Sequence, residues 1–261
     1  MDFSACAESH IFRIESGLPA AEARVRLVWG HGWGQDHRAF TQLAEALQTQ
    51  AHHVLLDFPG FGQSPPPPKG WDTMDYARAT AGLLQSLPFQ GKTIWVGHSF
   101  GCRVGLQLAS HYPEMLDGLI FIAGAGLTPK YTLWEKASLK SRIYVFKTLK
   151  WLWALLGGNV DNLRRHFGSQ DYRNAGTLRE TFLKVIAEDL SDVAGRVKCR
   201  TLLIYGTADV VTPPEMGERF RKLIPGARLV VLDGLDHDSL LAGGRHQTLK
   251  HLNGFVKDLV G

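Results

Sequence analysis

The sequence predicts an α/β fold in which a mainly parallel, doubly wound sheet carries one helical insertion. Short aliphatic runs alternate with longer amphipathic stretches along most of the chain, a pattern typical of a sheet covered by helices on both faces. One long stretch between two of these runs shows no strand pattern and is rich in helix formers and aromatic residues. A length of 261 residues suits one large domain with such an insertion.

The expected strands are short and apolar, as central strands buried on both faces are. The six core runs cover residues 24–29, 53–57, 93–96, 118–122, 201–205 and 228–232. Residues 10–15 are expected to add an edge strand. The helical patterns that separate these runs cover residues 37–49, 73–87, 100–112, 214–223 and 247–260.

The stretch from 127 to 195 is expected to form a helical cap, which leaves residues 1–126 and 196–261 as the core. Its aromatic residues include Trp134, Tyr144, Phe146, Trp151 and Trp153. Six basic residues lie between positions 130 and 150 against one acid, Glu135. They form either a solvated helix face over an apolar pocket or a docking surface for an acidic partner, such as an acyl carrier protein or an anionic membrane.

The composition is that of an ordinary globular protein, with 44% hydrophobic and 21% charged residues and a formal charge of +4. No basic run or motif indicates nucleic-acid binding. Three scattered cysteines do not make a disulfide framework, and residues 1–16 lack the pattern of a signal peptide. No apolar run is long enough to span a bilayer. We therefore expect a cytoplasmic protein without stable membrane insertion.

The segment Gly97-His98-Ser99-Phe100-Gly101 matches the pattern G-x-S-x-G. It lies between a strand run and a helix pattern, where a sharp turn would lift the Ser99 hydroxyl above the sheet edge. Flanking glycines relieve the crowding of such a turn, and the following helix N-terminus favours developing negative charge. Ser99 is thus the expected nucleophile.

A serine hydroxyl needs a base at neutral pH, and among 11 histidines the position decides which one serves. His237 directly follows the last predicted strand, where a loop can fold back over Ser99. Asp209 directly follows the strand before that and is the expected acid that orients His237. Three acids next to the base are competitors on composition, namely Asp233, Asp236 and Asp238. The loop at 123–127 contains no acid.

Two backbone amides are expected to stabilise an oxyanion. One belongs to Phe100, which follows the nucleophile. The other belongs to Trp33 in the segment His31-Gly32-Trp33-Gly34, which follows an early strand. The sequence shows no metal-ligand spacing and no phosphate-binding loop, so neither a metal nor a cofactor is expected.

Taken together, these residues resemble the α/β-hydrolase superfamily over nearly the whole chain. The segment from Asp57 to Ser64 is similar to the D-x-P-G-x-G-x-S segment of that superfamily, where its role is structural. The resemblance implies the α/β-hydrolase fold, with a sheet of about eight strands and a helical cap inserted after the sixth strand. His98 occupies the variable position of the turn, and the resemblance implies that it is packed rather than reactive.

Within the superfamily, His31-Gly32-Trp33-Gly34 and Pro59-Gly60-Phe61-Gly62 are similar to carboxylesterases of the pimeloyl-acyl carrier protein methyl ester esterase type. The turn departs from that family, which more often has tryptophan before the serine and leucine after it. The resemblance implies a serine carboxylesterase that acts through an acyl-enzyme on an ester substrate. A C–C bond hydrolase, an amidase, a non-catalytic ligand receptor and an inactive scaffold on the same fold remain as alternatives.

Overall fold

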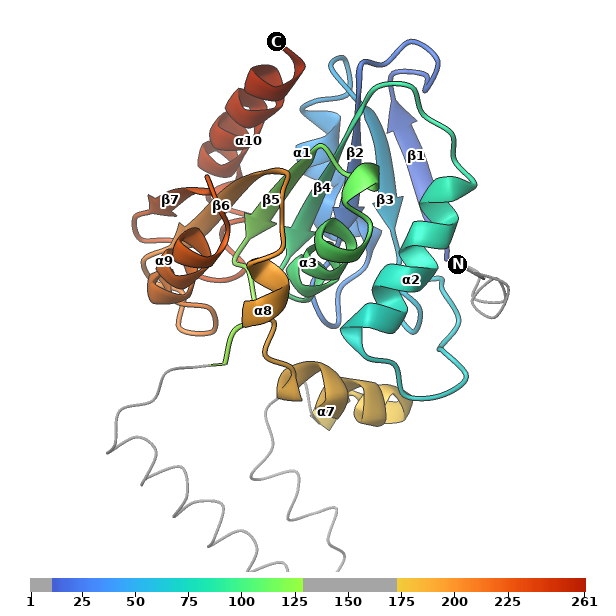
Figure 1. Cartoon of the computed structure of the whole chain (residues 1–261), viewed down its shortest axis with the longest axis vertical. Coiled ribbons are helices and arrows are strands. Elements are labelled where there is room, and N and C mark those ends of the chain that lie inside the picture. The colour runs from blue at the N-terminus through green and yellow to red at the C-terminus, as the bar shows by residue number, and fades with distance from the viewer. Residues whose placement is uncertain (1–10, 129–172) are drawn as a thin grey trace, which may run out of the picture.

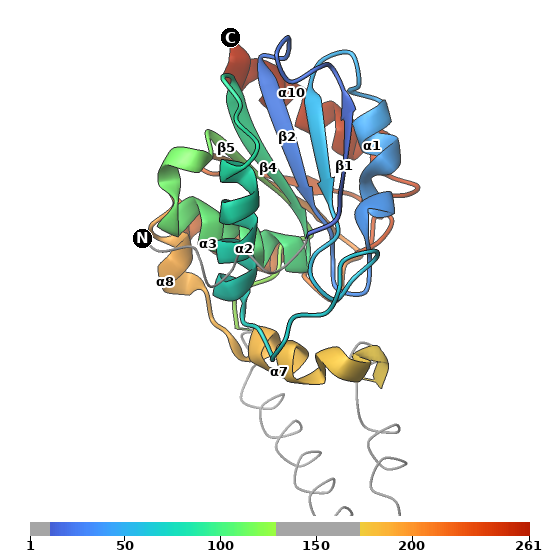
Figure 2. The same ribbon diagram turned by 90° about the vertical axis from the view of Figure 1, so that its right-hand side faces the viewer.

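A computed structural model describes residues 11–128 and 173–261. One central sheet is covered by helices on both faces (Figures 1 and 2). Its strands are β1 (Arg13–Gly17), β2 (Val25–Gly30), β3 (His52–Leu56), β4 (Lys92–His98), β5 (Gly118–Ile122), β6 (Arg200–Gly206) and β7 (Arg228–Leu232). The α-helices of the core are α1 (Thr41–Glu45), α2 (Thr73–Gln85), α3 (Phe100–His111), α9 (Pro214–Leu223) and α10 (Arg245–Val260).

The seven strands follow the order β1-β3-β2-β4-β5-β6-β7. All neighbouring pairs are parallel except β1 with β3, which pair antiparallel at the edge of the sheet. The fold class predicted from the sequence is therefore confirmed, and so is the edge strand, although it begins at Arg13 rather than at residue 10.

The central strands are buried on both faces because their side chains feed two separate cores. In β4, Trp95 packs with Tyr76 of α2 on one face. Ile94 and Val96 point to the other face, into the core that Phe255 of α10 joins. Alternation of this kind explains the near-continuous apolar runs, since neither face of an inner strand meets water.

The strand order also indicates at which end of the sheet a ligand would bind. After β2 the chain adds β3 on one side and then returns to add β4 on the other. The adjacent carboxyl ends of β2 and β4 thus lead into loops that diverge, which is where ligands bind in open α/β sheets. Gly30 at the end of β2 pairs with Gly97 of β4, two residues before the predicted nucleophile.

One predicted helix is broken in the structure. The pattern over residues 37–49 indicated a single helix, but a 3-10 helix (η2, His37–Phe40) is followed by the short α1. Tight turns then take over, because the amides of Leu47 and Gln48 bond to the carbonyls three residues back. The chain must tighten there to enter β3 at His52.

The predicted cap from 127 to 195 falls largely on residues 129–172, which lie outside the described residues. The rest contains a 3-10 helix (η4, Gly176–Leu178), α7 (Arg179–Ala187) and α8 (Ser191–Ala194). Side chains fasten this part to the core, because the Glu188 carboxylate accepts a hydrogen bond of 2.9 Å from the Thr73 amide of α2. The boundaries of the cap stay a prediction.

Two further findings concern the number of strands and the length of the helices. The described sheet has seven strands where about eight were expected, and the stretch predicted to form the cap lies between the fifth and sixth of these strands. Within residues 11–128 and 173–261, no helix combines the length and the apolar character that crossing a bilayer requires.

Candidate active site

Ser99 lies on a strained turn between β4 and α3. Its backbone angles are φ 48° and ψ −104°, outside the regions that a residue with a side chain prefers. Such a conformation costs about 1–3 kcal/mol and persists only where the surroundings enforce it. The Ser99 amide donates to the Ile122 carbonyl of β5 over 3.1 Å, which holds the turn against the neighbouring strand.

The two glycines that flank this turn are required by close approach. A Cβ atom on Gly101 would lie 1.9 Å from the Gly30 carbonyl oxygen of β2. A Cβ atom on Gly97 would lie 2.7 Å from the amide nitrogen of Cys102. The crowding expected from the sequence is therefore present, and glycine relieves it at both positions.

Asp209 and His237 come together from the loops after β6 and β7. Nδ1 of His237 lies 2.8 Å from Oδ2 of Asp209. The carboxylate is fully buried, whereas the imidazole is 17% exposed. Because Nδ1 faces the acid, Nε2 is the ring nitrogen left for proton transfer.

The aspartates next to His237 in sequence form other contacts. Asp233 accepts a hydrogen bond from the Thr207 hydroxyl, and Asp236 accepts one from the Ser239 amide. Among the described residues, Asp209 is the only carboxylate that bonds to the His237 ring.

Asp209 is held ionised by four donors. Besides His237, the amides of Val211 and Thr212 each donate to Oδ1 over 2.8 Å, and the Thr212 hydroxyl donates to Oδ2 over 2.8 Å. Burial by itself would raise the pKa of Asp209, but the hydrogen bonds from His237 and Thr212 hold that pKa below its usual value. The Asp209 carboxylate thus stays negatively charged although it is buried away from solvent.

His98 makes the contact between this turn and His237, and Ser99 and His237 form no direct hydrogen bond among the described residues. The Ser99 hydroxyl bonds to no other residue in the described part of the chain. His98, which precedes Ser99, lies against His237 with ring centroids 4.8 Å apart. The predicted base thus lies beside the turn that carries the predicted nucleophile. A nucleophile–base contact is often long in an unliganded site and tightens with substrate.

The two amides assigned to the oxyanion lie on adjoining segments. The Trp33 ring packs edge-on against the Phe100 ring, with centroids 5.5 Å apart. Across the residues that the structure describes, no acceptor takes a hydrogen bond from either amide. Both N–H groups are therefore available to a ligand.

A cavity of about 550 Å³ lies beside these amides. Trp33, Gly34, Gly60 and Phe61 line it from the core, and residues 174–178 line it from the segment that enters α7. The Trp33 ring also contacts Phe182 of α7 at 5.0 Å, so this helix borders the same region.

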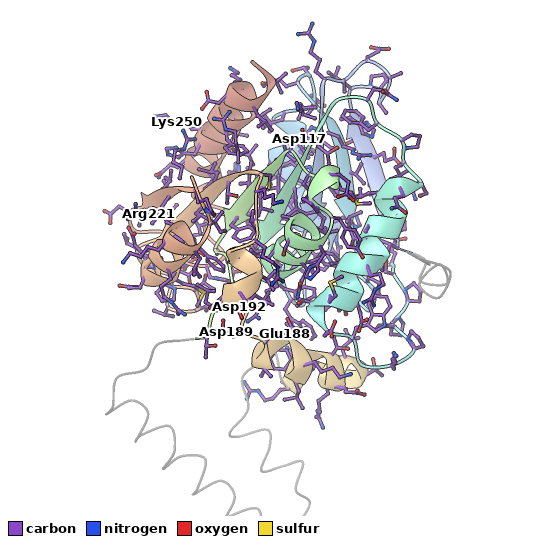
Figure 3. The ribbon with its side chains drawn as sticks, viewed as in Figure 1. Asp117, Glu188, Asp189, Asp192, Arg221 and Lys250 are labelled. Atoms are coloured by element: carbon purple, nitrogen blue, oxygen red, sulfur yellow. The ribbon has the colours of Figure 1, made fainter. Side chains whose placement is uncertain are left out.

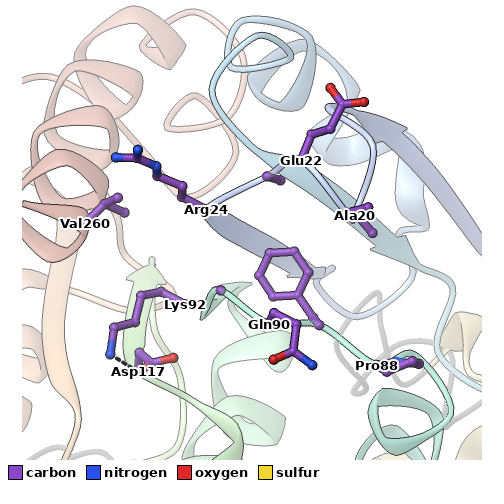
Figure 4. Close-up of a pocket in the computed structure, with 12 residues that line it drawn as sticks. Ala20, Glu22, Arg24, Pro88, Gln90, Lys92, Asp117 and Val260 are labelled. Atoms are coloured by element: carbon purple, nitrogen blue, oxygen red, sulfur yellow. Dashed lines mark hydrogen bonds and ion pairs between the residues drawn. The ribbon is translucent and has the colours of Figure 1, made fainter.

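A second cavity lies at the other end of the sheet. It has a volume of about 750 Å³ and is lined by Arg24, Lys92 and Asp117, where β2, β4 and β5 begin (Figure 4). Lys92 and Asp117 bond to each other there over 2.8 Å. Figure 3 shows Asp117 at the end of the core opposite Glu188. This cavity is therefore remote from Ser99.

One cluster has the donor types of a metal site, namely Asp36, His37 and Asp57. Asp57 is fully buried and already accepts three hydrogen bonds. Its Oδ1 accepts bonds from the amide and Nδ1 of His37, and its Oδ2 accepts one from the Gln63 amide. These bonds join two loops, which agrees with the structural role that the resemblance implied, and we assign no metal to the cluster.

Sequence reasoning missed three polar side chains around the site. Neither Thr212 nor Gln35 was singled out. His98 was expected to be packed, and it is buried, but it also bonds to residues from two other loops. Only Thr212 carried a usable signal, because a hydroxyl three residues after an acid can bond to it.

Comparisons with known proteins agree with this architecture. Residues 27–246 match the model of the alpha/beta hydrolase family. The chain is 25% identical over 233 residues to the pimeloyl-[acyl-carrier protein] methyl ester esterase of Chromobacterium violaceum, covering 81% of this chain and 87% of that protein. It is 26% identical over 245 residues to the enzyme of the same name from Neisseria meningitidis, covering 88% and 92%.

Solved structures show the same fold. A thermophilic esterase from Thermogutta terrifontis superposes with a TM-score of 0.72 at 18% identity, covering 96% of this chain and 94% of that one. An esterase from Exiguobacterium antarcticum gives a TM-score of 0.72 at 21% identity, covering 95% and 96%. Since the family model spans most of the sequence, the protein belongs to the alpha/beta hydrolase family.

Proposed function

We propose that the protein hydrolyses carboxylic esters, with Ser99 as nucleophile, His237 as base and Asp209 as the acid that orients His237. The observation that carries the proposal is a strained serine at the carboxyl end of β4, followed in the fold by a buried Asp209 that bonds to His237 beside the same turn. This arrangement suits acyl transfer, because a hydroxyl at neutral pH needs a base held in one tautomer.

The reaction proceeds in two halves. His237 takes the proton of the Ser99 hydroxyl through Nε2 while the oxygen attacks the ester carbonyl. The resulting oxyanion accepts hydrogen bonds from the Trp33 and Phe100 amides. Collapse breaks the ester C–O bond, and His237 returns the proton to the leaving alcohol. Water then repeats the sequence on the acyl-enzyme, which releases the acid and restores Ser99. Each proton and electron pair is accounted for without a cofactor.

The cavity beside Trp33 supports a small ester as the substrate. Its volume of about 550 Å³ falls in the range of small-molecule sites, and Trp33, Phe61 and Leu178 give it apolar walls. Asn174 and Thr177 add polar groups that can orient a substituted acyl or alcohol group.

An acyl carrier protein is the proposed macromolecular partner. Two relatives are named as esterases of a carrier-bound methyl ester, and the basic stretch at 130–150 is of the sign that an acidic carrier requires. That stretch lies outside the described residues. A carrier-linked role is consistent with the proposed cytoplasmic location.

The test is turnover of p-nitrophenyl esters of rising acyl length by the wild type and by Ser99→Ala. We expect the wild type to hydrolyse the shorter esters, and Ser99→Ala to lose at least about a thousandfold in kcat while it keeps its unfolding midpoint. Ser16→Ala, on the exposed edge strand, is the matched control and keeps full activity.

Absence of turnover in the wild type, or full turnover in Ser99→Ala, contradicts the proposal. Amide and diketone substrates in the same assay separate an amidase or a C–C bond hydrolase from an esterase. Saturable ligand binding without turnover would instead indicate a receptor.

A further inference from the structure

His98 touches two loops that enter the site from different parts of the chain. The ring is 1% exposed and stands at the end of β4, directly before Ser99. Its Nδ1 lies 3.1 Å from Oε1 of Gln35, in the loop after β2. Its Nε2 lies 3.1 Å from the main-chain oxygen of His237, in the loop after β7. We propose that His98 is a positioning residue that locks the loop of the Trp33 amide to the loop of the catalytic base.

On one side, Gln35 fixes the turn that carries Trp33. Its side-chain oxygen Oε1 accepts a hydrogen bond of 2.9 Å from the Gly32 main-chain amide, and the main-chain amide of Gln35 donates to the Gly32 carbonyl over 3.2 Å. The Gly32 residue is thereby bonded on both its amide and its carbonyl, which sets the direction of the peptide that leads into Trp33. Since His98 meets the same Oε1, it holds the side chain that holds this turn.

The glycine at position 32 makes this contact possible. A Cβ atom there would lie 2.8 Å from Oε1 of Gln35 and 2.8 Å from Nδ1 of His98. Both distances are too short for a carbon atom in van der Waals contact. Because Gly32 has no side chain, it leaves the space in which Gln35 and His98 come into contact.

On the other side, His237 is held at two points. Its ring is fixed by Asp209 through Nδ1, and its main-chain oxygen faces Nε2 of His98. The two imidazole rings also pack against each other at a tilt of 49°. A shift of His98 would therefore move the backbone from which the base projects.

His98 serves this role as a neutral ring. Burial, followed by the nearby His237, lowers the pKa of His98 to about 3, while Asp209 opposes this shift and His31 adds to it. A neutral imidazole carries one N–H, yet both neighbours of the ring are oxygen acceptors. His98 therefore donates to either Gln35 or His237 at a given moment, and replacements that keep one donor tell the two contacts apart.

This inference rests on the proposed function, because it assigns His98 to the positioning of the proposed oxyanion donor Trp33 and the proposed base His237. A misplaced oxyanion donor or base weakens transition-state stabilisation more than ground-state binding. We therefore expect loss of His98 to lower kcat while KM stays nearly constant.

The experiment uses the full chain and counts active sites by stoichiometric fluorophosphonate labelling. We expect His98→Phe, which removes both contacts, to lower kcat per labelled site by at least about tenfold with KM within about twofold. His98→Asn keeps a donor near the place of Nδ1, and His98→Gln keeps one near the place of Nε2. At least one of them should recover kcat to within about threefold of the wild type. His246→Phe, at an exposed position of α10, is the control.

Gln35→Met keeps the proposal testable if His98→Phe fails to fold. It removes the acceptor of Gly32 and should lower kcat with the same unchanged KM. In the double variant the two losses should be less than additive, because both act through one contact. Equal kcat per labelled site in the wild type and the single variants, or strictly additive losses, overturns the positioning role. Failure of the wild type to label at Ser99 overturns the proposed function instead.

Discussion

Thr212 shows how a single hydroxyl prepares the charge on which the proposed chemistry depends. It donates to Oδ2 of Asp209, the same oxygen that meets His237, and its oxygen lies 3.2 Å from Nδ1 of the imidazole. The carboxylate is fully buried, so each donor lost leaves charge uncompensated. The threonine thus supports both the ionisation and the orientation of Asp209.

We predict that Thr212→Val lowers kcat by about tenfold, because a hydrogen bond to a charged group is worth about 1.5–3 kcal/mol and 1.4 kcal/mol corresponds to tenfold. KM should change little, since the hydroxyl acts on the base. Steady-state kinetics on one ester checks this. Thr49→Val, at an exposed position before β3, is the control and keeps the wild-type kcat. An unchanged kcat in Thr212→Val would show that the amides alone hold Asp209.

Among the elements, the turn between β4 and α3 was the most predictable from the sequence. The contacts that His98 makes with Gln35 and His237 were the least predictable. G-x-S-x-G encodes its own geometry, because the residues that must be small are adjacent to the serine that must be strained. The contacts of His98 span 63 and 139 positions along the chain. No local pattern encodes such pairs, since they exist only once the sheet has brought the strand ends together.

The glycine requirement at this turn leads to a stability prediction. Gly101→Ala should destabilise the fold by about 3 kcal/mol or more, because its Cβ would overlap the Gly30 carbonyl of β2 and neither backbone can yield cheaply. Urea unfolding followed by circular dichroism measures the change. Gly82→Ala, inside α2 with no atom near the added Cβ, should instead stabilise by about 0.5–1 kcal/mol. A Gly101→Ala protein as stable as the wild type would contradict the close approach.

At the scale of the whole molecule, the positions of the strands along the chain and the parallel character of the sheet followed from the hydrophobic pattern, whereas the cap stays a prediction. Inner strands such as β5 are buried along their full length, so their apolar runs indicate both their position and their parallel pairing. The prediction of one helix over 37–49 was wrong, because hydrophobic periodicity does not indicate where the chain must change from α-helix to tighter turns before the next strand. The choice of Asp209 followed from its place after a strand, and the hydroxyl three residues later was the local signal that could have identified Thr212 as its partner.

Three buried histidines make the whole fold sensitive to acid. Burial lowers the pKa of His31 and His53 to about 4 and that of His98 to about 3, from an ordinary 6.5. The folded state favours the neutral form, so this contribution to stability is complete above pH 6.5 and is lost as the pH falls through about 4. The lowered pKa of Asp209 acts in the same direction at lower pH.

We predict that the free energy of unfolding falls by several kcal/mol between pH 7 and pH 4.5, with about 2 kcal/mol from each histidine of this kind. Urea titrations across this range measure it. His53→Asn keeps an acceptor for the indole N–H of Trp29, which now lies 3.1 Å from Nδ1, but cannot titrate. Its stability should depend less steeply on pH. A dependence identical to the wild type would show that His53 is not buried in the neutral form.

The most direct test of the account is the site and rate of covalent labelling by a fluorophosphonate, read by peptide mass spectrometry. We predict one adduct per chain, on Ser99, and a labelling rate that falls at least about a thousandfold in His237→Ala at an unchanged unfolding midpoint. An adduct on another residue, or labelling of His237→Ala as fast as the wild type, would contradict the claim that this imidazole activates that hydroxyl.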